Sequence, residues 1–72
     1  MTAIPARELA EYAEQNRLLA AYYRAAADLA NNTAREAAAG ITHETDDYSR
    51  LNDAATAAAK ALPKSLRHVA DA

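Results

Sequence analysis

Alanine content and the position of one glycine constrain this chain more than any other feature. Twenty-two of its 72 residues are alanine, and the only glycine, Gly40, lies near the middle. Alanine has the highest intrinsic helix propensity, and glycine is the residue most often found just past the end of a helix. The sequence therefore predicts a single all-α domain over residues 1–72, in which Gly40 separates two helical segments.

The first predicted helix is long, from about residue 5 to residue 39. Pro5 suits a first turn, where its missing N–H has no partner to lose, and Glu8 adds negative charge near the positive end of the helix dipole. The polar triplet at residues 31–33 offers the backbone competing hydrogen bonds, so a break near this point is left open.

A turn over residues 40–42 should lead into a second, medium helix at about 43–62. Thr42 and Thr45 are both suitable N-caps for this helix. Pro63 must end it, because proline removes a backbone donor and clashes with the preceding turn. A short C-terminal helix is expected over residues 63–70, which completes a helical hairpin with one short extra element.

The large apolar residues of the first helix fall on two stripes at helical spacing. One stripe contains Leu9, Tyr12, Leu19 and Tyr23, and the other contains Ile4, Leu18, Tyr22 and Leu29. The stripe of the second helix is Tyr48, Leu51, Ala55, Ala58, Ala59 and Leu62. The two stripes of the first helix cover about half of its circumference, which is more than one partner helix needs. This width predicts that the hairpin dimerises into a four-helix-type bundle.

Small size also favours self-association. A chain of 72 residues is marginally stable alone and usually needs a disulfide, a metal or a second subunit. There is no cysteine, so disulfides and thiolate metal sites are excluded, and tryptophan and phenylalanine are absent. A homodimer is the stabilising device that remains.

Charge and hydropathy exclude several classes of function. The formal charge is −2, whereas a general nucleic-acid binder displays a basic patch. No apolar run approaches the roughly 20 residues of a membrane span, and the N-terminus lacks the pattern of a signal peptide. We therefore expect a cytoplasmic protein without a membrane partner, and the Ala- and Arg-rich composition suggests a bacterial or phage origin.

Catalytic residues are not evident in the sequence. The two histidines lie far apart, the serines have no evident base, and one glycine cannot form a phosphate-binding loop. His43 and Asp47 are spaced to share a helix face, but an acidic first helical turn explains them without a metal. The chain is predicted not to be an enzyme and to bind neither a cofactor nor a metal.

DNA binding is the alternative reading. The stretch from Ala37 to Asn52 resembles the turn and recognition helix of helix-turn-helix repressors, and the resemblance implies that Arg50 would contact DNA. Two positions depart from that pattern, because Asp46 and Ser49 occupy places where apolar core residues are expected. The acidic residues at the start of this helix also have the wrong sign for phosphate.

The favoured prediction is a non-enzymatic protein–protein interaction module, such as an adaptor, inhibitor or regulatory subunit, encoded by a phage or mobile element. Affinity would come from a Leu/Tyr/Ala helix face, because tyrosine gives large contact area at low entropic cost. The residues predicted to contact a protein partner or a second copy are Leu9, Tyr12, Leu18, Leu19, Tyr22, Tyr23, Tyr48 and Leu51.

Overall fold

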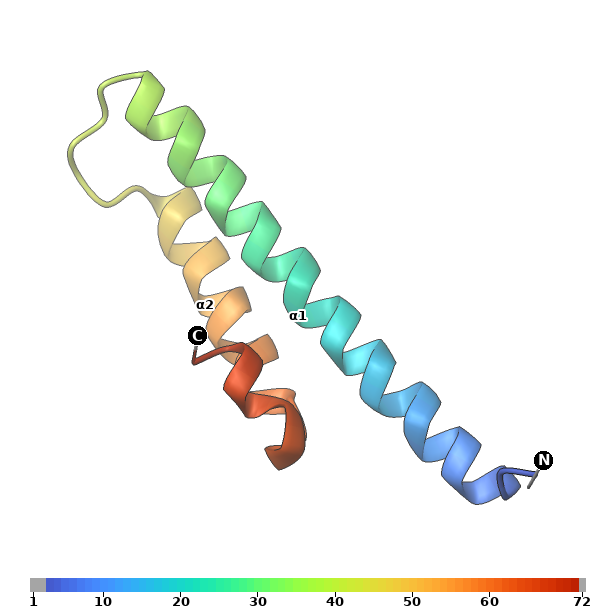
Figure 1. Ribbon diagram of the computed structural model, residues 1–72. Coiled ribbons are helices and arrows are strands. Elements are labelled where there is room, and N and C mark those ends of the chain that lie inside the picture. Colours follow the sequence, from blue (N-terminus) through green and yellow to red (C-terminus); the bar gives the residue numbers. More distant parts are fainter. Residues whose placement is uncertain (1–2, 72) are drawn as a thin grey trace.

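The computed structural model describes residues 3–71, which form an α-helical hairpin (Figure 1). Helix α1 spans Ala6–Ala38, helix α2 spans Asp46–Ala61, and the 3-10 helix η1 spans Lys64–Val69. No strand occurs within residues 3–71. The predicted all-α class, with one long and one medium helix, is confirmed.

Helix α1 is continuous through Asn31–Thr33, so the break that the sequence left open does not occur. The Thr33 hydroxyl donates to the Leu29 carbonyl at 2.9 Å. The Asn32 side chain also bonds within the helix, since its amide donates to the Glu36 carboxylate at 3.1 Å. Side chains that compete with the backbone in an open chain are here bonded back into the helix.

Gly40 ends α1 in the way the sequence predicts. Its φ is +75°, a left-handed conformation that costs glycine little because it has no Cβ. The Gly40 N–H donates to the Ala37 carbonyl at 3.1 Å, and the Ile41 N–H donates to the Glu36 carbonyl at 3.0 Å. These two bonds form a Schellman motif, which satisfies carbonyls that the helix end leaves free.

Helix α2 is shorter than the predicted range of 43–62. It begins only after Thr45, because the Thr45 hydroxyl accepts the Tyr48 N–H at 3.0 Å and so acts as the N-cap. At the other end Leu62 is extended, with ψ of 140°, since it precedes Pro63 and residues before proline avoid helical geometry.

The N-cap gives a first prediction. Thr45→Ala should lower the free energy of unfolding by about 1–2 kcal/mol, because both the cap and a bond to Glu36 are lost. Thr42→Ala is the matched control: Thr42 is exposed in the connection and no part of the cap, so its loss should be close to zero. Urea titrations followed by circular dichroism measure both, and equal midpoints for the two variants would contradict this assignment.

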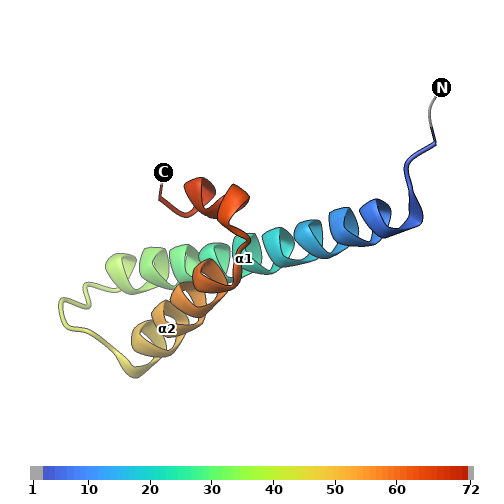
Figure 2. The same cartoon turned by 90° about the horizontal axis from the view of Figure 1, so that it is seen from below.

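Helix α2 lies antiparallel along the C-terminal half of α1 only (Figures 1 and 2). With a rise of about 1.5 Å per residue, α1 is about 50 Å long and α2 about 24 Å. The molecule measures 56 × 20 × 19 Å, and its radius of gyration of 16.2 Å exceeds the roughly 11 Å of a compact domain of this size. One end of α1 therefore projects away from the rest of the chain.

The core is small. Leu62, 1% exposed, and Asn32, 2% exposed, are the only residues in the described part of the chain that are fully buried. Every position of the predicted α2 stripe is half-buried or buried, together with Asn52. Alanine supplies much of this stripe, so α1 and α2 pack with few bulky side chains between them.

Candidate interaction surface

The projecting half of α1 is the most exposed part of the fold. All residues from Ala3 to Glu14 are exposed, because neither α2 nor η1 extends alongside them (Figure 1). Large apolar side chains lie on this segment: Leu9 is 50% exposed and Tyr12 is 68% exposed. Tyr23, eleven residues further along α1, is 53% exposed. Exposed side chains of this size on one helix are typical of a binding surface.

The two predicted stripes of α1 have different environments. Tyr22 and Leu29, from the second stripe, line a groove together with α2 residues, and Leu18 is half-buried. Three residues of the first stripe remain exposed, whereas Leu19 is half-buried. The predicted interface residues on α2, Tyr48 and Leu51, are also half-buried. The chain thus uses the second stripe internally apart from Ile4, which is 59% exposed, and leaves most of the first stripe uncovered.

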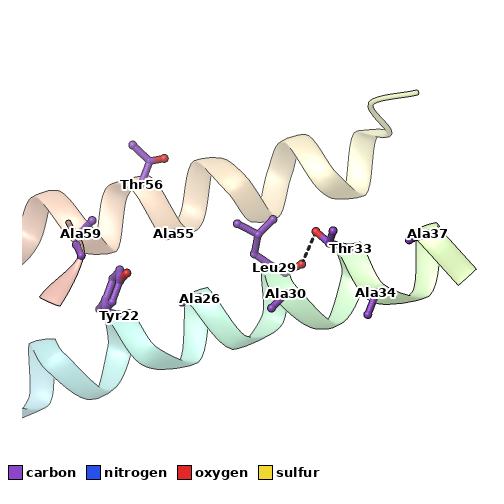
Figure 3. Close-up of a pocket in the computed structure, with 11 residues that line it drawn as sticks. Tyr22, Ala26, Leu29, Ala30, Thr33, Ala34, Ala37, Ala55, Thr56 and Ala59 are labelled. Atoms are coloured by element: carbon purple, nitrogen blue, oxygen red, sulfur yellow. Dashed lines mark hydrogen bonds between the residues drawn. The ribbon is translucent and has the colours of Figure 1, made fainter. Parts of the chain in front are cut away.

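An apolar groove of about 630 Å³ follows the C-terminal half of α1 (Figure 3). Its lining consists of small side chains with two larger ones: Tyr22, Ala26, Leu29, Ala30, Thr33, Ala34 and Ala37 of α1, Ala55, Thr56 and Ala59 of α2, and Ala70. In Figure 3, Leu29 points toward α2 and Ala34 points away from it. The groove therefore continues onto the face of α1 that α2 does not cover. Sequence reasoning missed these α1 alanines, since alanine periodicity alone does not distinguish a groove from a solvated face.

A polar network joins α1 to the start of α2. The Arg35 guanidinium donates to the Asn32 amide oxygen at 3.1 Å, and the Asn32 amide nitrogen donates to Glu36. The same Glu36 oxygen accepts the Thr45 hydroxyl proton at 2.6 Å. No buried side-chain nitrogen or oxygen within residues 3–71 lacks a partner, so this network is fully satisfied. It joins the end of α1 to the N-cap of α2.

The projecting half of α1 also has one ion pair. Arg17 donates to both carboxylate oxygens of Glu14, and this hydrogen bond lowers the pKa of Glu14 from its usual value and raises that of Arg17. Both side chains are more than half exposed, so solvent screens the pair and its contribution to stability is small. Any contribution from Glu14 is present above the usual carboxyl pKa and is lost as the pH falls through the lowered value.

The segment that resembles a helix-turn-helix motif has a different arrangement in space. The connection from Ala39 to Thr45 has seven residues, whereas a helix-turn-helix has a turn of three or four. Helix α2 runs antiparallel along α1, and Asp46 and Asp47 occupy its first turn. Arg50 is exposed and lies 3.6 Å from the Asp47 carboxylate. These features give no support for phosphate binding by α2, and we do not propose it.

Two further findings concern metals and membranes. Among the residues that the structure describes, no group of three His, Cys, Asp or Glu side chains could hold a metal ion. His43 is exposed in the connection. No helix within residues 3–71 is long and apolar enough to cross a membrane.

Comparison with protein-family models gives no match, and searches of curated proteins and of solved structures also find no similar protein. The function is therefore inferred from the surfaces of this chain.

Proposed function

We propose that this chain is a non-enzymatic protein–protein interaction module that binds through the exposed apolar stripe of α1. The observation that supports this proposal is the uncovered half of α1, with Leu9, Tyr12 and Tyr23 each at least half exposed. Burying apolar area of this kind is the dominant favourable term in most protein–protein association. An adaptor, inhibitor or regulatory subunit of phage or mobile-element origin is the kind of module that we propose.

The first binding partner that we propose is a second copy of the chain. The buried core has one apolar side chain, Leu62, within residues 3–71, and small domains with so little core are usually stabilised by oligomerisation. Two hairpins would then assemble as a four-helix-type bundle. A different protein could bind the same stripe in an adaptor or inhibitor.

Charge placed on the stripe is expected to abolish binding. Tyr23→Glu should weaken self-association at least tenfold, because a carboxylate would be buried in an apolar contact. Sedimentation velocity over a concentration series measures the association constant. A pull-down from a lysate of the cells that encode the chain measures capture of other proteins. Ala10→Glu is the matched control, since Ala10 is exposed on the opposite side of the same helix and its charge should have no effect.

Circular dichroism should show equal helicity for Tyr23→Glu and Ala10→Glu, since both positions are exposed. A wild-type chain that stays monomeric at all concentrations and captures no protein would refute the proposed function. Binding that is unchanged in the Tyr23→Glu variant would also refute the proposed function.

A further inference from the structure

We infer that the second copy binds antiparallel, with the two α1 helices paired along their whole length and Tyr23 at the two-fold axis. This inference rests on the proposed function and adds the geometry of the self-interface. The bulky projecting half of each α1 would lie against the alanine-rich half of its partner's α1.

The uncovered face of α1 follows a heptad repeat. Leu9, Asn16, Tyr23, Ala30 and Ala37 are spaced by seven residues, and Tyr12, Leu19, Ala27 and Ala34 lie between them on the same face. Spacing by three and four residues is the pattern of a helix that pairs with another helix along one seam. Apart from half-buried Leu19, these residues are exposed. The seam therefore runs nearly the full length of α1, although α2 covers only the other side of its C-terminal half.

The two halves of the seam are complementary in size when one helix is reversed. If Tyr23 lies opposite its own copy, Leu9 lies opposite Ala37 and Tyr12 lies opposite Ala34. The same register places Asn16 opposite Ala30 and Leu19 opposite Ala27. Large side chains thus face small ones along both halves, which is how packed helices fill the space between them.

The groove provides room for this pairing. Ala30, Ala34 and Ala37 line the apolar groove of about 630 Å³ (Figure 3), and these are residues that the reversed register places opposite Asn16, Tyr12 and Leu9. The projecting half of one α1 has bulky side chains on this face. The other half has a groove and no bulky side chains along it on the uncovered face.

Helix lengths agree with the same arrangement. Helix α1 is about 50 Å long and α2 about 24 Å, so one α2 covers half of an α1. In the antiparallel pair the two α2 helices, one from each copy, lie at opposite ends of the dimer. Each uncovered half of α1 then lies beside the half of its partner that packs on α2. A parallel pair would instead place both α2 helices at one end and leave two bare α1 segments at the other.

The exposed side chains of the seam supply about half of the area that a small stable dimer needs. Tyr12, Tyr23 and Leu9 are 68%, 53% and 50% exposed. Covering these three side chains removes roughly 300 Å² per copy from water, since aromatic side chains bury about 150–250 Å² each. Alanine and backbone along a seam of about 42 Å add to this area. The smallest stable interfaces need roughly 600 Å² per partner.

Introduced cysteines test the geometry directly, because the natural chain has none. Leu9→Cys and Ala37→Cys are prepared separately, mixed, and oxidised in a glutathione buffer. The antiparallel register predicts a disulfide between the two variants in the mixture, and no disulfide-linked dimer from Leu9→Cys alone. A parallel pair, which Asn16 facing its own copy would favour, predicts the opposite result.

A second measurement avoids any change in the seam. A nitroxide label on Ala10→Cys, on the opposite face of α1, reports the distance between the two copies by pulsed electron paramagnetic resonance. The antiparallel dimer predicts about 40 Å or more, and a parallel dimer predicts less than about 25 Å. This distance distinguishes the antiparallel dimer from the parallel dimer even if the Leu9→Cys variant folds poorly.

The outcomes separate this inference from the proposed function. A dimer that is lost in Tyr23→Glu but gives the parallel distance would overturn the antiparallel geometry and keep the interaction surface. A monomer that still captures another protein through Tyr23 would overturn the self-interface alone. A dimer unaffected by Tyr23→Glu would refute both.

Discussion

Leu62→Ala is expected to lower the free energy of unfolding by about 2–5 kcal/mol. Leu62 is 1% exposed and is the only fully buried apolar residue within the described part. Leucine-to-alanine changes in a core cost about 2–5 kcal/mol, while a 72-residue domain has a total stability of roughly 4–10 kcal/mol. The single substitution would therefore remove a large share of the free energy of unfolding. Thermal denaturation followed by circular dichroism at a fixed protein concentration measures this loss.

Ile4→Ala is the matched control for this prediction. It removes the same number of carbon atoms from a side chain that is 59% exposed, precedes α1 and lies outside the proposed interface. Its effect on the monomer should be below about 1 kcal/mol. A melting temperature that falls equally in both variants would contradict the view that the junction between α2 and η1 contains the core.

Asn32→Asp is expected to be the most damaging change among polar residues. The Asn32 amide is 2% exposed and donates to a Glu36 carboxylate oxygen at 3.1 Å. The substitution replaces that donor with a second carboxylate, so two negative charges meet in a site with little water. The Arg35 guanidinium, which donates to the Asn32 oxygen at 3.1 Å, offsets part of this repulsion, so the loss should be about 1–3 kcal/mol. Urea denaturation at neutral pH measures the loss.

Acidification should reverse this effect, because a protonated carboxyl can again donate to Glu36. The free energy lost at pH 7 should therefore shrink as the pH is lowered toward 4. Asn31→Asp makes the same chemical change at the adjacent, exposed position and should cost less than about 0.5 kcal/mol at either pH. Equal losses for the two variants would show that the Asn32 network contributes nothing specific.

The hairpin itself follows from local chemistry in the sequence. Alanine propensity, the left-handed Gly40, the Thr45 cap and Pro63 each act over a few residues, so their effects can be predicted without tertiary contacts. The stripe of α2 could be predicted for the same reason, since helical periodicity determines which residues share a face. The structure differs from the sequence prediction at the start of α2, which begins after Thr45 rather than at about 43. The possible break at residues 31–33, which the sequence left open, does not occur.

Tertiary structure decided which of the two α1 stripes is covered. Both stripes have similar side chains, so periodicity gives no preference between them. Which stripe is covered depends on the position of α2. That position depends on the hydrogen bond between Thr45 and Glu36 at the start of α2 and on the burial of Leu62 at its C-terminal end. The same packing buries Asn32, which sequence analysis treated only as a weak point of the helix. The sequence by itself determined the helices and their approximate ends, because these depend on neighbours a few residues away. Only the folded hairpin determined which face of α1 is left exposed, because that depends on contacts between residues far apart in the chain.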